Sequence, residues 1–121
     1  MKKLALVLAI FVLPLCAQSK LRLTPEQAIA IRHPRDLRWS PDGKSLAMTV
    51  SEPSKGSERL THIWLYSAET AAVRQFTFST KSESNARWSP DGRTLAFLSD
   101  RDDEKQIFVI PVDGGEARRL T

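Results

Sequence analysis

Two histidines are the side chains in this sequence best suited to acid–base or metal chemistry. His62 precedes an apolar run, Ile63 to Tyr66, and His33 precedes a proline that ends a predicted helix. Neither histidine has partners at the spacing of a metal site, and the sequence has no Gly-x-Ser-x-Gly motif to expose a serine nucleophile. We therefore predict no catalytic, metal or cofactor residues, and we interpret His62 as a polar residue at a strand end.

An acidic run, Asp100 to Glu104, has the oxygen ligands that Ca²⁺ prefers. An EF-hand loop that begins at Asp100 requires glycine at position 105, where this sequence has Lys105. The alternative is a charged hairpin tip between two strands, in which Arg101 and Lys105 partly neutralise the acids. We favour the hairpin tip.

The elements that must position these side chains follow from an internal repeat. Eleven positions from Arg38 align with eleven from Arg87, and both copies contain Trp-Ser-Pro-Asp-Gly. Trp39 and Trp88 are 49 residues apart, a spacing typical of repeats that each form one four-stranded blade of a β-propeller. The sequence predicts an all-β chain with two four-stranded antiparallel blades, residues 36–83 and 84–121.

Turn and strand signals recur at matching places in the two copies. Proline at the second and glycine at the fourth position of Ser-Pro-Asp-Gly suit a tight type I turn. Residues then alternate with period two, which indicates a strand, and small Ala47 and Ala96 are predicted to let neighbouring blades stack closely. The equivalent positions of Trp39 and Trp88 favour packing over ligand binding.

The first copy has five more residues than the second between its second and third strands. This insertion, Glu52 to Arg59, is charged and rich in serine, with one proline and one glycine. Such insertions map to loops on one face of a propeller, where variable contacts are made. A solvated loop without a binding role is the alternative.

The amino terminus has the pattern of a secretory signal peptide. Lys2 and Lys3 precede an apolar run from Leu4 to Leu15, and small residues follow. The run is shorter than the roughly 20 apolar residues of a membrane span. We predict a signal peptide at residues 1–17, export to the periplasm or the medium, and no stable membrane span after cleavage. A lipoprotein anchored through Cys16 is the alternative, but Leu15 is a poor residue at the position before the cysteine.

Residues 18–35 form a predicted leader to the blades. Thr24, Pro25 and Gln27 match a capping box with proline at the first helical position, so we expect a short helix from Pro25 to about Ile31. Removing residues 1–17 takes two lysines from a net charge of +4, leaving +2 and no cysteine. Charges of both signs alternate along an exported chain, so we expect no nucleic-acid partner.

Both copies of the repeat, the Gln106–Val109 strand and the Asp113–Thr121 ending resemble the amino-terminal propeller of prolyl oligopeptidase-family serine peptidases. The acylaminoacyl-peptidase and dipeptidyl-peptidase branch is the most similar, because Leu23-Thr24-Pro25-Glu26 precedes the first blade. The blades are also similar to Tol-type and other WD-like repeats. The resemblance covers residues 23–121.

This resemblance implies a propeller that screens the access of peptides to an α/β-hydrolase domain holding the serine, aspartate and histidine of the parent enzyme. None of that domain is in this sequence, so we expect an inactive fragment whose peptide substrates are bound elsewhere in the parent. The alternative is a periplasmic Tol-like scaffold. Because a propeller needs about 4 to 8 blades, a third alternative is self-association through exposed blade faces.

Overall fold

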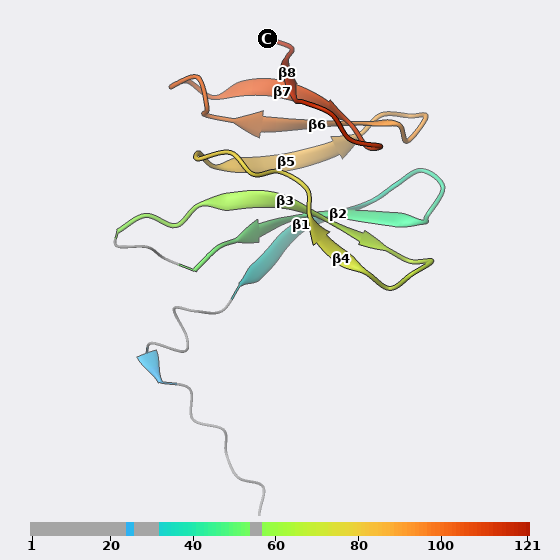
Figure 1. Ribbon diagram of the computed structural model, residues 1–121, viewed down its shortest axis with the longest axis horizontal. Coiled ribbons are helices and arrows are strands. Elements are labelled where there is room, and N and C mark those ends of the chain that lie inside the picture. The colour runs from blue at the N-terminus through green and yellow to red at the C-terminus, as the bar shows by residue number, and fades with distance from the viewer. Residues whose placement is uncertain (1–23, 26–31, 54–56) are drawn as a thin grey trace, which may run out of the picture.

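The computed structural model describes residues 24–25, 32–53 and 57–121, and it consists of two four-stranded antiparallel sheets (Figure 1). Blade 1 has the strand order β1-β2-β3-β4, and blade 2 repeats it as β5-β6-β7-β8. The strands of blade 1 are β1 (His33–Trp39), β2 (Ser45–Ser51), β3 (Thr61–Ser67) and β4 (Val73–Gln75). The strands of blade 2 are β5 (Glu83–Trp88), β6 (Thr94–Ser99), β7 (Gln106–Pro111) and β8 (Arg118–Arg119).

The predicted all-β fold class with two antiparallel four-stranded blades is confirmed. The predicted signal peptide at residues 1–17, including Cys16, lies outside the described residues. Of the predicted helix, residues 26–31 also lie outside them. Within the described part of the chain, no helix has the length and apolar character needed to cross a membrane.

The start of the first strand differs from the sequence prediction. We interpreted His33 as a helix-end residue and placed the blade near Asp36, but β1 begins at His33, which pairs with Ser51. The strand begins earlier than predicted because its pairing with β2 continues on the amino-terminal side of an irregularity between Arg35 and Arg38. Proline at position 34 is tolerated because β1 is an edge strand of its sheet.

The irregularity is a β-bulge that both blades share. Asp36 in β1 has φ 49° and Asn85 in β5 has φ 56°, and each lies where the register with the next strand shifts. Aspartate and asparagine tolerate this left-handed conformation better than other non-glycine residues. The repeat therefore encodes the bend of the first strand of each blade as well as the turn that follows it.

The predicted Ser-Pro-Asp-Gly turns are present in both blades with matching geometry. The Gly43 amide donates to the Ser40 carbonyl oxygen over 2.9 Å, and the Gly92 amide donates to Ser89 over the same distance. Both glycines have φ 70°, a conformation that L side chains rarely adopt. The turns fix the register of the β1–β2 and β5–β6 hairpins.

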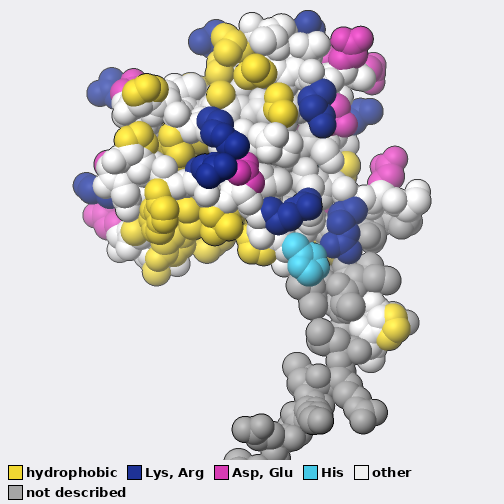
Figure 2. All heavy atoms as spheres, turned by 180° about the vertical axis from the view of Figure 1, so that it is seen from behind, with side chains coloured by type: hydrophobic (Ala, Val, Ile, Leu, Met, Phe, Trp, Pro, Cys, Tyr) yellow, Lys and Arg dark blue, Asp and Glu magenta, His cyan; other side chains and the backbone are white. Residues whose placement is uncertain are grey.

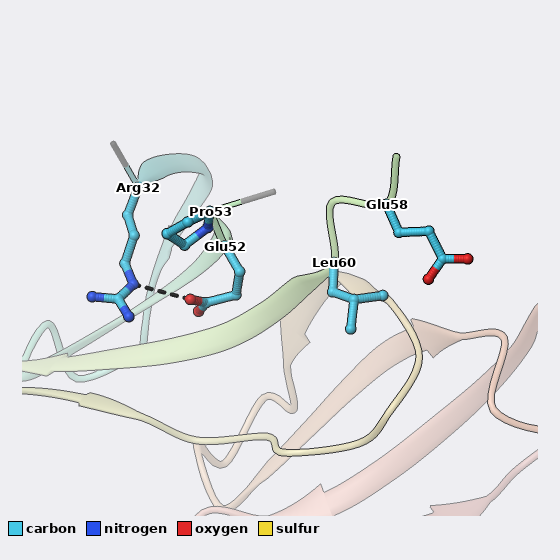
Figure 3. Close-up of a pocket in the computed structure, with 5 residues that line it drawn as sticks. All are labelled: Arg32, Glu52, Pro53, Glu58 and Leu60. Carbon is cyan, nitrogen blue, oxygen red and sulfur yellow. Dashed lines mark hydrogen bonds and ion pairs between the residues drawn. The ribbon is translucent and has the colours of Figure 1, made fainter. Parts of the chain in front are cut away.

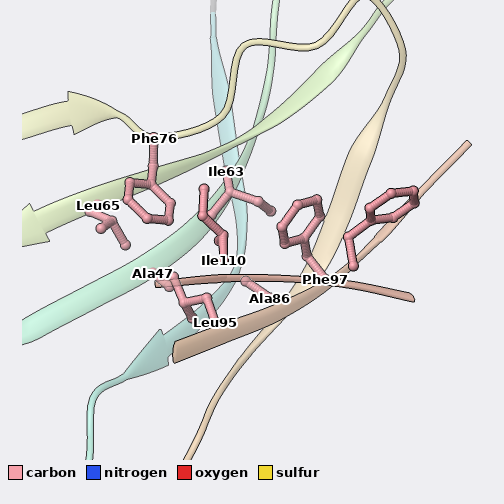
Figure 4. Packing of buried hydrophobic residues seen from close by; sticks show 9 residues of the cluster. Ala47, Ile63, Leu65, Phe76, Ala86, Leu95, Phe97 and Ile110 are labelled. Carbon is pink, nitrogen blue, oxygen red and sulfur yellow. The ribbon is translucent and has the colours of Figure 1, made fainter. Parts of the chain in front are cut away.

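The apolar core lies between the two sheets (Figure 4). Blade 1 contributes residues from β2, β3 and the segment just after β4, and blade 2 contributes residues from β5, β6 and β7. They are Ala47, Ile63, Leu65 and Phe76 from blade 1, and Ala86, Leu95, Phe97, Phe108 and Ile110 from blade 2. Each sheet alone is too thin to bury these side chains, so the blade-to-blade contact is the hydrophobic core of the molecule.

The two small alanines that the repeat places at equivalent positions have different surroundings. Ala47 is fully buried in the contact between the sheets, as a close-stacking role requires. Ala96 is only half-buried, because it lies on the face of blade 2 that points away from blade 1. Ala47 thus has the stacking role predicted for it, and the same role for Ala96 stays a prediction.

Candidate functional site

The structure does not bring the two histidines together. His33 is exposed at the start of β1, whereas His62 is buried in β3. In the described residues, no group of three or more histidine, cysteine, aspartate or glutamate side chains is placed to hold a metal ion. The chemistry of this chain therefore has to be sought in the contacts between its blades and on their surfaces.

A buried polar network connects the blades at the edge that carries the β2–β3 loop. His62 Nδ1 lies 3.1 Å from Glu83 Oε2, and the side chain of Glu83 is completely shielded from solvent. The other carboxylate oxygen of Glu83 accepts a hydrogen bond from Arg101, and its backbone carbonyl accepts the Thr61 hydroxyl over 2.8 Å. Glu83 thus joins β3, β5 and the β6–β7 loop.

The role of Arg101 differs from the sequence prediction. We expected it to neutralise the neighbouring acids at a hairpin tip, but its guanidinium turns inward to Glu83 and lies 4.6 Å from the centre of the Phe108 ring. The acids around it face outward: Asp102 lies 3.6 Å from Arg119 and Asp103 lies 3.8 Å from Lys81. The hairpin itself is present between β6 and β7.

Sequence reasoning missed Glu83 because the other copy of the repeat has no ionisable residue at the equivalent position. The residue 49 positions earlier is Pro34, which makes no equivalent network. A glutamate next to serines is typical of a solvated linker, and its burial depends on the long-range contact between β3 of one sheet and the start of β5 of the other. The signal that was available is the break in the repeat: an ionisable residue replaces proline.

The two aspartates of the repeat turns have an electrostatic signature. The pKa of Asp42 is lowered, chiefly because the Ser40 hydroxyl donates to its Oδ1 over 2.5 Å and then because the Lys44 amide donates over 3.0 Å. The pKa of Asp91 is lowered for the same reasons by Ser89 and Arg93. These carboxylates hold turns in shape, so their function is structural.

The equivalent tryptophans have different environments, and only Trp88 packs against the core as predicted. The Trp88 indole N–H donates to the Arg38 carbonyl oxygen over 2.8 Å and so joins blade 2 to blade 1. Trp39 is 54% exposed and touches only the edge of Tyr66, with 6.4 Å between ring centres. The difference arises because blade 1 covers Trp88, and no described blade covers Trp39.

A charged contact joins β1 and β5 close to this indole. Asp36 in β1 accepts Arg87 of β5 over 2.9 Å and lies 3.1 Å from Arg38 of its own strand. Figure 2 shows several basic side chains on one face of the molecule, with an acidic side chain among them. The contact is half-exposed, so it orients the blades more than it stabilises them.

The Glu52–Arg59 insertion forms part of a pocket, as Figure 3 shows. The pocket has a volume of 370 Å³ and lies between Arg32, which precedes β1, and the described parts of the β2–β3 loop, Glu52, Pro53, Glu58 and Leu60. Arg32 Nε donates to Glu52 over 3.0 Å, and its guanidinium lies 5.6 Å from the centre of the Trp64 ring. Arg32 thus contacts both Glu52 and Trp64 at one side of this pocket.

The sequence of this chain is similar to those of known proteins. The model of the TolB β-propeller domain family matches residues 9–121. The chain belongs to this family. A curated relative, named "Uncharacterized peptidase YuxL" from Bacillus subtilis (strain 168), is 38% identical over 101 residues. The match covers 82% of this chain and 15% of that protein, so the chain spans a small part of the relative's length.

Solved structures of propellers are similar to this TolB-family chain. A putative TolB from Agrobacterium tumefaciens has a TM-score of 0.60 and 28% identity over 77% of this chain and 32% of its own. TolB from Acinetobacter baumannii has a TM-score of 0.55 and 32% identity, and the match covers 70% of this chain and 20% of that protein. An acylaminoacyl peptidase in complex with Z-Gly-Gly-Phe-chloromethyl ketone has a TM-score of 0.65 and 19% identity. The match covers 78% of this chain and 15% of that protein, and it shows a likeness of fold. The resemblance to peptidase and Tol-type propellers is thus confirmed.

Proposed function

We propose that this chain supplies two blades of the propeller domain of an exported serine peptidase. In this proposal, a separate catalytic domain of the parent protein hydrolyses peptides, and the propeller screens which chains reach it. The observation that carries the proposal is the 38% identity over 101 residues to a Bacillus subtilis protein named as a peptidase. The Leu23-Thr24-Pro25-Glu26 lead before the first blade supports the same branch of peptidases.

The screening role is supported by how the blades are built. A filter has to keep its shape while extended peptides pass, and folded proteins have to be refused. The apolar core between the sheets and the buried Glu83 network hold blade 2 at one orientation to blade 1. In this proposal, the β2–β3 loop, whose described residues line a pocket of 370 Å³, is a variable surface at the rim of the propeller.

The complete natural reading frame that contains this sequence tests the proposal. We expect a serine-directed fluorophosphonate to label the purified product. We also expect the product to hydrolyse short chromogenic peptides far faster than a folded protein that contains the same peptide sequences. Replacing the serine of its Gly-x-Ser-x-Gly motif with alanine is the control. A frame that encodes further blades but no such motif contradicts the peptidase proposal.

The proposed location is the periplasm or the extracellular medium. It is supported by Lys2 and Lys3, the apolar run to Leu15 and the small residues before Gln18. Expression of the chain with its native amino terminus is expected to yield an exported product that begins at Gln18, as mass spectrometry of fractionated cells can measure. A product that retains Cys16 with an attached lipid favours the lipoprotein alternative.

A periplasmic binding scaffold of the Tol type is the second candidate function. It is favoured by the family match and by identities of 28% and 32% to two TolB structures. A scaffold makes protein contacts through its rim and has no peptidase domain. Hydrolysis by the complete product, abolished by the serine variant, is the result that argues against this candidate.

A further inference from the structure

We propose that the first strands of the two blades form a cationic strip beside the axis of the propeller, and that this strip binds the acidic side chains of extended peptides. The cationic strip consists of Arg35 and Arg38 from β1 and Arg87 from β5. The proposal rests on the proposed function, because it is the propeller of the parent peptidase that screens peptides. It adds the chemical class of peptide that the screen favours.

The cationic strip lies on the side where the two sheets approach each other most closely. The backbone of β5 contacts β1, β2 and β3, whereas within the described residues neither β4 nor β8 contacts the other blade (Figure 1). The sheets therefore diverge from their first strands toward their last, as blades do when they radiate from an axis. Because the blades of a propeller surround a central channel, β1 and β5 are the strands that border this channel.

The repeat shows that a neighbouring blade leaves these guanidinium groups accessible. Arg38 and Arg87 occupy equivalent positions, 49 residues apart. Arg38 has a described blade on its following side and Arg87 has one on its preceding side, and their side chains are 50% and 51% exposed. A blade on either side thus leaves about half of the side chain open. The exposure of the cationic strip does not arise from an uncovered sheet face.

Two of the arginines share a single carboxylate. Asp36 Oδ1 lies 3.1 Å from Arg38 Nη2, and Asp36 Oδ2 lies 2.9 Å from Arg87 Nη1. This shared acid holds two guanidinium groups from different blades close together. A guanidinium has five N–H donors, and these contacts use one nitrogen of each group. Donors on the remaining nitrogens are left for a further carboxylate, whose planar geometry matches that of arginine.

The third arginine adds charge that its described partner does not cancel. Arg35 Nη2 donates to the uncharged hydroxyl of Ser51 over 3.0 Å. The second acid of these two strands, Glu83, is completely buried and paired with Arg101, so it does not offset the cationic strip. Three guanidinium groups therefore face one partly exposed carboxylate, an excess of two positive charges on β1 and β5. Figure 2 shows several basic side chains on one face of the molecule.

An acidic peptide is the partner that fits this charge. A cleft lined by one sign of charge concentrates ligands of the opposite sign. Arg35 and Arg38 are three positions apart in a strand, which places their Cα atoms at most about 10 Å from each other. A terminal carboxylate pairs with one or two of the three guanidinium groups, whereas alternate side chains of an extended peptide recur about every 7 Å. The cationic strip therefore favours a row of aspartate or glutamate side chains.

The affinities of charge-matched peptides test the proposal without relying on hydrolysis. The protein is the complete natural product, in which the serine of the Gly-x-Ser-x-Gly motif is replaced with alanine so that peptides are bound and not cut. The probes are dye-labelled peptides with blocked ends, in which every second residue is glutamate or, in the matched probe, glutamine. We expect the glutamate peptide to bind about fivefold more tightly at low salt, and the difference to shrink as salt is added.

Single substitutions assign the effect to the cationic strip. Arg35→Gln and Arg87→Gln each remove one charge, so we expect each to weaken binding of the glutamate peptide about two- to fivefold and to leave the glutamine peptide unchanged. Arg118→Gln is the matched control, because it makes the same change in net charge on the exposed last strand, β8. It is expected to change neither affinity. Circular dichroism melts verify that each variant is folded.

A gain of affinity provides a measurement that does not depend on disruption. Asp36→Asn removes the only partly exposed carboxylate of the two strands, and we expect it to tighten binding of the glutamate peptide about two- to fivefold at low salt. Asparagine suits the backbone there, because Asn85 occupies the equivalent position of blade 2 with φ 56°, close to the φ of 49° at Asp36. Weaker binding by this folded variant contradicts the proposal.

Three further results overturn the proposal. The first is equal affinity for the glutamate and glutamine peptides. The second is a loss in Arg118→Gln as large as that in the strip variants, which indicates a general effect of net charge. The third is a glutamine peptide with a free carboxyl terminus that binds as tightly as the blocked glutamate peptide, which indicates recognition of the terminus.

Failure of the proposed function gives a different result. A complete product that binds the glutamate peptide through the cationic strip, but hydrolyses no peptide before its serine is replaced, contradicts the peptidase proposal and supports the cationic strip. A product that hydrolyses glutamate and glutamine peptides with equal kcat/KM and binds them equally supports the peptidase and contradicts the cationic strip.

Discussion

At the scale of single residues, the repeat supplies internal controls, because the same side chain occurs with and without a neighbouring blade. Trp88 donates its indole hydrogen bond to blade 1, whereas Trp39 is 54% exposed. We predict that Trp88→Phe lowers the free energy of unfolding by about 1 kcal/mol, the usual value of a lost hydrogen bond. Trp39→Phe is expected to stay within about 0.5 kcal/mol. Urea unfolding of both variants at low protein concentration checks this, and equal losses contradict it.

Glu83 is the residue whose removal should cost most among the polar side chains. Alanine at this position leaves Arg101 and His62 without their shared acceptor inside the molecule. We predict that Glu83→Ala lowers the free energy of unfolding by about 2–4 kcal/mol, because breaking a buried charged network leaves uncompensated groups behind. The measurement is denaturant unfolding followed by tryptophan fluorescence.

The matched control for Glu83 is Glu104, an exposed carboxylate in the β6–β7 loop. Glu104→Ala is expected to change stability by no more than about 0.5 kcal/mol. A loss at Glu83 no larger than that at Glu104 shows that the buried network is not what holds the blades together. Glu83→Gln separates charge from shape, since the amide keeps the volume and one acceptor oxygen.

The turn aspartates predict how stability depends on pH. The folded pKa of Asp42 and of Asp91 lies below the ordinary value of 3.8, because serine hydroxyls and backbone amides donate to each ionised carboxylate. Their contribution to stability is therefore fully present above pH 3.8 and is lost as the pH falls through the lowered pKa. We predict that Asp42→Asn/Asp91→Asn melts at a lower temperature than the unmodified chain at pH 6.

The same comparison in acid completes this test. Once the carboxylates are protonated, the asparagine variant loses its disadvantage, so the two melting curves should converge as the pH approaches and passes the lowered pKa values. Melts of the unmodified chain over the same pH range are the reference for this comparison. A gap in melting temperature that is constant from pH 6 to acid contradicts the assigned role of the turn carboxylates.

At the scale of elements, the packing of β2 and β6 gives the two alanines of the repeat opposite tolerances. Ala47 is completely buried between the sheets, and a bulky side chain there has to push them apart. We predict that Ala47→Leu lowers the free energy of unfolding by about 1–3 kcal/mol through overpacking. Ala96→Leu is expected to stay within about 0.5 kcal/mol in the monomer, as chemical unfolding can measure. Equal effects contradict the assignment of the inner face.

The elements themselves were largely predictable. Period-two alternation placed β2 and β6, and apolar runs rich in β-branched and aromatic residues placed β3 and β7. The Ser-Pro-Asp-Gly turns fixed two hairpins. All of these signals are local. The beginning of β1 was not predictable, because His33 and Pro34 have no local strand signal and pair only through the ladder with β2. The Glu83 network was missed for the same reason: its partners lie 18 and 21 residues away.

At the scale of the whole molecule, the repeat predicted the architecture and left the site undetermined. Sequence reasoning placed two similar blades in order, but their shared residues differ in exposure according to whether a neighbour covers them. Trp39 and Trp88, or Ala96 and Ala47, cannot be distinguished by local pattern, because the difference arises from the stacking of sheets. Identical motifs therefore do not have identical roles in one chain.

The one-sided order of the inter-blade contacts also determines how this molecule can be made. Blade 2 packs through β5, β6 and β7 onto strands that precede it in the chain, and Trp88, Arg87 and Glu83 all bind partners synthesised earlier. Domains generally form during synthesis from the amino terminus onward. A nascent chain thus has the strands of blade 1 available before the strands of blade 2 emerge to pack against them.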